Sequence, residues 1–479
     1  MKSRTLDLHR VIWQYDQTVI GDLYATSIPD DAEVLAKHPL LFDGIELVGH
    51  PEHLFLEPAL TLRAGLIKTP EDHRENPIYD FAGYYHAFTT TFEEAVRLRD
   101  RLRNTSGVRE ANVQDYWEQP VRLGHYTKKA TETIFKKLSL YPEPTMNLMG
   151  RQTYLNAAPT GVDAHFAWKR PGGRGDGIRI VDIEDGWNFG HEDLIERQAG
   201  VIFGQNSDDD HGTAVLGVYS GDQNEYGVIG IASDAIASAS SVLIPNHPGW
   251  NPEAAIKYAA DHLHPGDVML LEMHFSGPNS DPEDDSQRGY VPTEYWNVGF
   301  AAVEYAVNKG IYVVEAAGNG SENLDSRVYK GVFDRDIRDS GAIMVGAGAS
   351  DKSKNPRARL WFSNYGSRLD VQAWGENVVT TGGRTEAKYH NLIDHEDRNR
   401  CYTQSFGGTS SASAIIAGVV AVISGCVKAA DRPPLSPLAM RQLLVETGSP
   451  QADIPQYPAS KHIGPLPDLR KALERLELA

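Results

Sequence analysis

The pattern of apolar positions along the chain changes near residue 160. From about Gly161 onward, short runs rich in Val, Ile and Leu alternate with segments whose apolar residues recur at helical spacing. These runs predict strands at 178–183, 267–273, 310–317 and 341–349. Nearly continuous apolar strands separated by helices are typical of a parallel sheet covered by helices on both faces. The sequence therefore predicts an α/β fold whose functional groups gather at the carboxyl ends of the strands.

The first part of the chain has a different pattern. Residues 83–89 alternate like a strand, and residues 91–104 follow as a helix in which Thr91 and Glu94 form a capping box. A turn and a second strand complete a βαβ unit over 83–114. We divide the chain into three parts: a smaller α+β domain over 1–117, a connector over 118–160 and the larger domain over 161–479.

Composition and charge exclude several classes of protein. The 479 residues include 46 Lys and Arg against 65 Asp and Glu, a net charge of −19 at pH 7. This acidic balance disfavours nucleic acid and anionic membranes as partners, because their phosphates would repel it. No apolar run has the length of a signal peptide or a membrane span, so we expect a cytoplasmic protein. Cys401 and Cys426 are too few for a disulfide scaffold, and either two thiols or one disulfide fits.

Residues suited to acyl transfer stand where the predicted strands end and the predicted helices begin. In chain order they are Asp182, His211, Asn319 and Ser410. A serine hydroxyl needs an imidazole as base, and the imidazole needs a carboxylate to fix its tautomer. The free N–H groups at the start of a helix stabilise a developing oxyanion. The set therefore predicts a nucleophilic serine.

These segments resemble the subtilisin-like serine peptidases. The resemblance rests on five blocks in that family's order: IRIVDIEDGW, HGTAVLG, AAGN, FSNYG and GGTSSASAIIAG. It implies a three-layer subtilisin-like fold with a mostly parallel sheet, and a serine endopeptidase that acts on proteins or peptides through an acyl-enzyme without a cofactor. It also implies a role for each residue of the set: Ser410 as nucleophile, His211 as general base, Asp182 as orienting carboxylate and Asn319 in the oxyanion hole.

The orienting carboxylate has more than one candidate. The stretch DIEDG offers Asp182, Glu184 and Asp185. Asp182 ends the strand pattern as the family's aspartate does, whereas Asp185 precedes a glycine, as the family's Asp-x-Gly loosely suggests. Strand register favours Asp182.

Two glutamates interrupt the strands that lead to the substrate pocket. The resemblance implies that this pocket is lined by Ala316, Ala317, Gly318, His274, Phe275 and Ser276. Glu272 and Glu315 stand just before these residues. A buried carboxyl group is costly unless it is paired or protonated. Either the two share a proton or bind local backbone and Arg groups, or they point into the pocket and favour a basic substrate side chain.

Two acidic runs, at 206–210 and 279–287, invite a calcium interpretation. Neither has the spacing of an EF-hand, so we expect solvated loops and no metal site.

The N-terminal part has two interpretations. Many subtilisin-like peptidases carry a small propeptide that occupies the cleft, and the βαβ unit resembles half of such a domain. The segment 115–126 is then a candidate to thread the active site. The alternative is a permanent accessory domain.

A catalytically silent or autoinhibited binding module is the alternative function for the whole chain, and the presence of all four catalytic residue types argues against the silent form.

Overall fold

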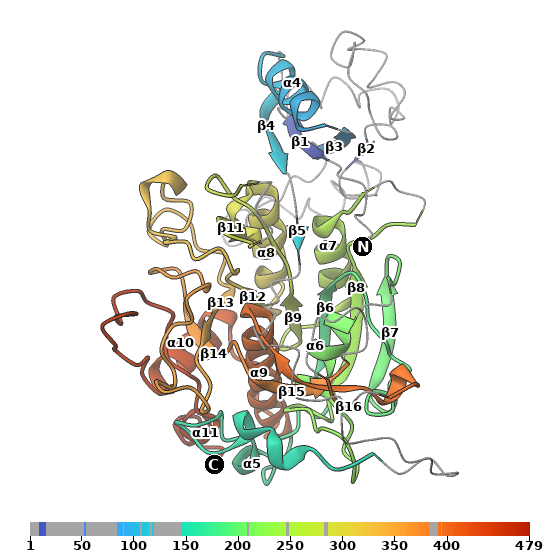
Figure 1. The fold of residues 1–479 in the computed structure, drawn as a ribbon, viewed down its shortest axis with the longest axis vertical. Coiled ribbons are helices and arrows are strands. Elements are labelled where there is room, and N and C mark those ends of the chain that lie inside the picture. Colours follow the sequence, from blue (N-terminus) through green and yellow to red (C-terminus); the bar gives the residue numbers. More distant parts are fainter. Residues whose placement is uncertain are drawn as a thin grey trace, which may run out of the picture.

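A computed structural model describes most of the chain (Figure 1). The described residues are 9–15, 52–53, 84–89, 91–105, 108–114, 117–118, 145–207, 210–245, 249–281, 286–382, 391–393 and 395–479.

A seven-stranded sheet forms the centre of the larger part, with the strand order β14-β13-β12-β9-β6-β8-β7. Its strands are β6 (Arg179–Glu184), β7 (Gln198–Phe203), β8 (Ile236–Ser241), β9 (Val268–Leu271), β12 (Tyr312–Ala316), β13 (Ile343–Gly348) and β14 (Val371–Trp374). All neighbouring pairs are parallel. The predicted parallel sheet is confirmed.

Helices cover both faces of this sheet. On one face lie α6 (Asp210–Ser220) and α9 (Thr409–Ala429), and on the other lie α7 (Pro252–His262) and α8 (Asn297–Asn308) (Figure 1). Alternate residues of each strand feed the two apolar cores. In β6, Ile180 packs on the α9 side and Val181 on the α7 side, as the two-residue period of a strand requires. The three-layer fold is confirmed.

Helix α9 passes through the middle of the molecule. It is apolar on nearly all sides, and its residues from Thr409 to Val427 are buried. It is the one helix of the described residues that is long and apolar enough to cross a bilayer, and its most apolar stretch is wholly inside the fold, as in the core helix of a soluble protein. Gly408 precedes it with φ of 97°, a conformation that favours glycine.

Shorter elements surround this centre. The other α-helices in the described residues of the larger part are α5 (Ala164–Ala167), α10 (Pro437–Thr447) and α11 (Leu469–Arg475). One three-stranded antiparallel sheet contains β15 (Val378–Thr381), β16 (Asn391–Ile393) and β17 (Tyr402–Phe406). Another contains β11 (Tyr290–Pro292), β10 (His274–Ser276) and β5 (Trp117–Glu118) in that order.

The N-terminal unit is a four-stranded antiparallel sheet with one helix. It consists of β1 (His9–Tyr15), β2 (Glu52–His53), β3 (Tyr84–Thr89), α4 (Phe92–Arg103) and β4 (Val108–Gln114). The predicted strand, helix and strand are confirmed, and the Thr91 side chain accepts the backbone N–H of Glu94 as a cap. The sequence pattern missed β1, which lies between β3 and β4.

A buried arginine joins the N-terminal unit to the larger part. The Arg10 guanidinium of β1 donates to Gln114 at 2.7 Å and to Glu253 of α7 at 3.0 Å, and both members of the Arg10–Glu253 ion pair are fully buried. Figure 1 shows the small sheet beyond the ends of α7 and α8. The predicted connector is described only from residue 145, and there Tyr154 and Leu155 pack in the core of the larger part.

Candidate active site

Two carboxyl groups of β6 face the helices α6 and α9. Asp182 and Glu184 are two residues apart, so their side chains emerge on the same face as Ile180, and both are fully buried. Glu184 is the last residue of β6, at the carboxyl end where the sequence predicts functional groups.

His211 and Ser410 stand at the beginnings of two helices on that same face. Each is the second residue of its helix, α6 and α9 respectively. His211 Nδ1 lies 2.7 Å from Glu184 Oε2, and His211 Nε2 lies 3.0 Å from Ser410 Oγ. The imidazole therefore bridges a carboxyl group and a hydroxyl, and all three side chains are fully buried.

The carboxyl group that contacts His211 is not the one that the sequence favoured. Neither Asp182 nor Asp185 is the carboxyl group that contacts His211. Asp182 lies two residues before Glu184 on the same face of β6, and its Oδ2 accepts the indole N–H of Trp187 at 2.7 Å. Glu184 is nearer the strand end and carries one more methylene. The assignment of Asp182 as the partner of His211 is thus corrected to Glu184.

Burial shifts the pKa values of this carboxyl pair upward. Burial raises the pKa of Asp182 to about 7, although a hydrogen bond from Trp187 opposes the shift. Burial, followed by the charges of Asp182 and Glu272, raises the pKa of Glu184. A hydrogen bond between the Asp182 and Glu184 carboxyl groups raises the pKa of Glu184 further and lowers that of Asp182. Since two carboxylates are both acceptors, this bond needs a proton on one of them.

Asn319 lies at the start of α9, beside Ser410. Its Oδ1 accepts the backbone N–H of Thr409 at 3.0 Å, and its Nδ2 donates to Gln287 at 3.1 Å. Its own backbone N–H donates to His274 Nδ1 at 3.2 Å. The amide is thus fixed by elements that are far apart in the sequence.

The six residues predicted to line the substrate pocket lie on two segments that meet near Asn319. His274, Phe275 and Ser276 form β10, and Ala316, Ala317 and Gly318 run from the end of β12. The Asn364 side chain, within the FSNYG block, donates to Ala317 O at 2.6 Å and to Tyr290 O at 2.8 Å. The sequence did not assign this bridging role to Asn364.

The two glutamates in question face opposite sides of the sheet. Glu315 pairs in register with Leu271, so the next residue, Glu272, points the other way. Glu272 is fully buried beneath α9, where Ser413 Oγ lies 2.6 Å from its Oε1. The two glutamates therefore do not meet in one pocket, and the interpretation in which they share a proton is excluded.

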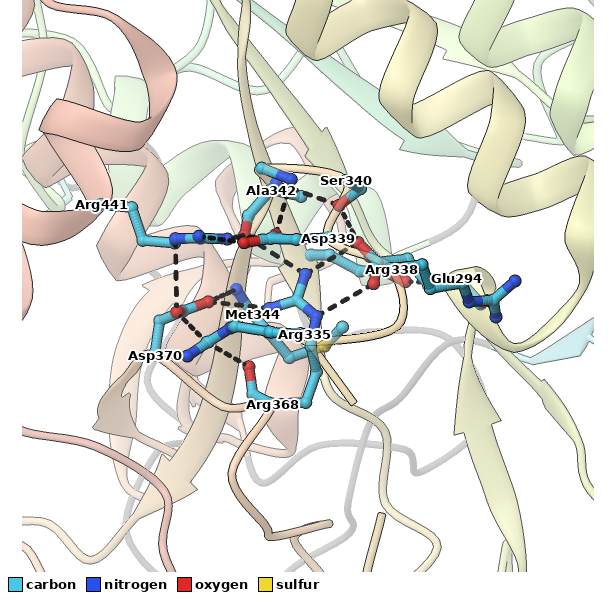
Figure 2. A network of polar contacts seen from close by, with 12 residues as sticks. Glu294, Arg335, Arg338, Asp339, Ser340, Ala342, Met344, Arg368, Asp370 and Arg441 are labelled. Atoms are coloured by element: carbon cyan, nitrogen blue, oxygen red, sulfur yellow. Dashed lines mark hydrogen bonds and ion pairs between the residues drawn. The ribbon is translucent and has the colours of Figure 1, made fainter. Parts of the chain in front are cut away.

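Glu315 belongs to a buried ionic network on the side of α8. Its Oε1 accepts the backbone N–H of Glu294 at 3.2 Å. Figure 2 shows Arg368 of this network, which contacts Glu294 at 2.8 Å and Asp370 at 2.9 Å. This agrees with the interpretation in which Glu315 binds local backbone and Arg groups.

Neither a metal cluster nor a disulfide is present among the described residues. No group of three or more His, Cys, Asp or Glu side chains there could hold a metal ion. The acidic runs lie partly outside the described residues, which omit 208–209 and 282–285. Cys401 and Cys426 are both buried and free, so the disulfide alternative is excluded.

Comparison with known proteins places the chain in a family. The model of the subtilase family, Peptidase_S8, matches residues 192–463, which is more than half of the chain. The chain therefore belongs to the subtilase family of serine proteases. The match begins after β6 and does not include Glu184.

Curated relatives and solved structures agree with this family. An intracellular serine protease of Paenibacillus polymyxa is 28% identical over 322 residues, covering 62% of this chain and 82% of the relative. The major intracellular serine protease of Bacillus subtilis (strain 168) is 26% identical over 291 residues, covering 56% and 76%.

Two solved structures share the fold. The crystal structure of fervidolysin from Fervidobacterium pennivorans, described as a keratinolytic enzyme related to subtilisin, matches with a TM-score of 0.58 at 16% identity, over 99% of this chain and 62% of that chain. The epidermin leader peptide processing serine protease of Staphylococcus aureus matches with a TM-score of 0.54 at 15% identity, over 99% of both chains. At these identities the likeness shows the fold alone.

Proposed function

We propose that the protein is a serine endopeptidase that cleaves peptide bonds through an acyl-enzyme on Ser410. The observation that carries this proposal is the unbroken chain from Ser410 Oγ through the His211 imidazole to Glu184 Oε2, with contacts of 3.0 and 2.7 Å. A hydroxyl, an imidazole and a carboxyl group in this order are what a serine nucleophile requires.

The first half of the reaction forms the acyl-enzyme. With a proton on Nδ1, His211 donates to Glu184, and Nε2 accepts the proton of Ser410 as Oγ attacks the substrate carbonyl carbon. The C–N bond then breaks, and Nε2–H gives its proton to the leaving amine. In the second half, water repeats these steps against the ester and frees Ser410.

Glu184 takes the orienting role because it is the carboxyl group that the imidazole contacts. A cation that forms on His211 favours the ionised form of a carboxyl group 2.7 Å away. In the resting site the pKa directions favour a proton on Glu184. We propose that the charge on His211 outweighs this preference during the reaction, so that the proton of the Asp182–Glu184 hydrogen bond lies on Asp182, which then supports the Glu184 carboxylate as a donor. Asp182 is thus a positioning residue for Glu184.

The oxyanion would be held by Asn319 and the start of α9. An amide NH2 group has two donors, so the bond from Asn319 Nδ2 to Gln287 is compatible with a second bond to the oxyanion. The backbone N–H of Ser410, in the first turn of α9, is the second donor.

An extended peptide is the substrate that the edge of β10 fits. In the chain itself, β5 pairs antiparallel with β10, with Glu118 opposite His274 and Trp117 opposite Phe275. A substrate that takes the place of β5 would gain the same backbone hydrogen bonds. The N-terminal unit is then a propeptide-like inhibitor, and removal or displacement of β5 frees the edge strand. The segment that follows β5, 119–144, lies outside the described residues.

Two of the relatives are named intracellular serine proteases, which supports the expectation of a cytoplasmic enzyme.

A serine in this environment should react with a fluorophosphonate, so the test is the intact mass of the full chain with and without this probe. We expect one adduct in the native sequence and none in the Ser410→Ala variant. A folded native protein that forms no adduct, even after limited proteolysis of residues 1–144, contradicts the proposal.

A further inference from the structure

Glu272 lies behind the proposed nucleophile, and the reaction steps above do not use it. It directly follows β9, and its backbone N–H donates to Ile183 O of β6 at 3.2 Å. Its side chain is fully buried and reaches the first turn of α9, where its Oε1 lies 2.6 Å from Ser413 Oγ. Ser413 is one turn after Ser410.

The Ser413 hydroxyl has more acceptors than protons. Besides Glu272 Oε1, it lies 2.8 Å from Thr409 O and 3.0 Å from Ser410 O. A hydroxyl has one proton to donate and two lone pairs to accept with. If Glu272 is a carboxylic acid, its O–H donates to Ser413, and Ser413 donates to a backbone carbonyl of the first turn. If Glu272 is ionised, Ser413 donates its single proton to the carboxylate, and no proton is left for the backbone carbonyls.

The surroundings of Glu272 also disfavour a negative charge. A carboxylate accepts several hydrogen bonds, yet Glu272 Oε2 has no hydrogen-bond partner among the described residues. Asp182 and Glu184 approach from β6, Tyr219 from α6, and Ser410 and Ser413 from α9. Burial, followed by the charge of Asp182, raises the pKa of Glu272, and hydrogen bonding from Ser413 and Ser410 offsets part of this shift.

We propose that Glu272 is a neutral carboxylic acid that donates to Ser413 and so positions Ser410 and its backbone N–H in the first turn of α9. This inference rests on the proposed function and makes Glu272 a positioning residue. Ionisation of Glu272 would break the link to the backbone and place a negative charge behind the site where the oxyanion forms. Activity should therefore fall as Glu272 loses its proton.

The catalytic test compares the rates of fluorophosphonate labelling in four full-length variants. Glu272→Gln should keep most of the native rate, because its amide N–H donates to Ser413 as the acid does. Glu272→Ala and Ser413→Ala should each lose up to about 100-fold, the size expected for a misplaced reacting group, and the double variant should lose little more. The control is Glu376→Gln, which alters a half-buried glutamate that is also bonded to a serine, Ser350, and should leave the rate unchanged.

The pH profile separates this role from a merely structural one. Glu272→Gln should lose the alkaline decline of the labelling rate that ionisation of Glu272 causes. The inference is overturned if Glu272→Gln is as slow as Glu272→Ala at every pH in folded samples, since a carboxylate is then required. It is equally overturned if Glu272→Ala reacts at the native rate.

A stability measurement tests the protonation of Glu272 without any activity. In a Ser410→Ala background, Glu272 should bind a proton when folded and release it when unfolded, because its pKa is raised in the fold. Above the ordinary glutamate pKa of about 4.3 and below the raised pKa of folded Glu272, the folding equilibrium constant of the Glu272→Gln variant should rise relative to its parent by about tenfold per pH unit. A ratio that does not depend on pH overturns the inference. Absence of labelling in the native protein, even after limited proteolysis of residues 1–144, by contrast contradicts the proposed function alone.

Discussion

The Nδ1 atom of His211 lies 2.7 Å from Oε2 of Glu184, and this contact joins the end of β6 to the start of α6. The same imidazole reaches Ser410 Oγ through Nε2. Glutamate has one more methylene than aspartate, so the carboxyl group can reach the ring from the last residue of the strand. The contact makes specific predictions for the residues around it.

Glu184→Gln should reduce kcat by about 10,000-fold, because the amide cannot hold the imidazole in the correct tautomer or stabilise its cation. Glu184→Asp keeps the charge but withdraws it from the ring, and its loss should be smaller. Asp182→Asn should retain most of the activity, since its amide can still donate to Glu184. Steady-state kinetics on a peptide substrate check all three. If Asp182→Asn were the more damaging substitution, the sequence-based assignment of Asp182 would be restored.

Asn319→Asp should lower kcat by at least about 100-fold and leave KM nearly unchanged, because the donor to the oxyanion acts only in the transition state. The aspartate keeps the Oδ1 acceptor for the Thr409 N–H and so preserves the start of α9. Asn319→Ala removes both functions and should also lower the thermal midpoint. An active Asn319→Asp enzyme would show that the oxyanion is stabilised elsewhere.

Arg10→Ala should release the N-terminal unit from α7. The substitution leaves Glu253 buried without its cation, which costs about 3 to 5 kcal/mol when a buried ion pair is broken. We expect faster fluorophosphonate labelling of Ser410 and faster cleavage of the N-terminal unit by an added protease. Arg97→Ala is the matched control, because Arg97 belongs to the same unit but its side chain is 55% exposed. Unchanged labelling of a variant whose N-terminal unit has become protease-sensitive would contradict the inhibitory role of β5.

The sequence predicted the parts of the fold whose physical cause is local. Apolar runs such as 178–183 identify buried strands, and the capping box of Thr91 and Glu94 identifies the start of α4. The strand β1 was missed because its second residue, Arg10, is buried only through partners on other elements. No periodicity marks a buried arginine whose charge is balanced by residue 253.

The choice of carboxyl group at the active site needed three-dimensional information. Strand register placed Asp182 on the correct face, and Glu184, two residues on, shares that face. Which of the two carboxyl groups contacts the imidazole depends on where α6 places His211 relative to β6, and it places His211 beside Glu184. The sequence did contain a signal, because Glu184 stands two residues before Gly186, where the Asp-x-Gly pattern has its aspartate. The signal was missed because the pattern was read as requiring an aspartate at that position. The faces of Glu272 and Glu315 likewise depended on the register between β9 and β12.

A buried aspartate away from the active site predicts how stability depends on pH. Burial raises the pKa of Asp193 to about 7, although bonds from Asn224, Val228 and Tyr402 oppose the shift. Between about pH 4 and about pH 7, the folded chain therefore holds a proton on Asp193 that the unfolded chain releases. The contribution of Asp193 to the free energy of unfolding falls over this range as the pH rises, by about 1.4 kcal/mol per pH unit.

Asp193→Asn should remove this fall, because asparagine does not titrate. Urea unfolding in a Ser410→Ala background, which prevents self-cleavage, measures the difference between the two chains across this pH range. Asp261→Asn supplies a comparison of opposite sign. Burial alone would raise the pKa of Asp261, but hydrogen bonds from Lys257, Lys309 and Tyr305 outweigh burial and lower it. Its carboxylate therefore stabilises the fold above its unfolded pKa, and that contribution is lost as the pH falls. If Asp193→Asn left the pH dependence unchanged, Asp193 would be ionised in the folded protein, held by its three donors.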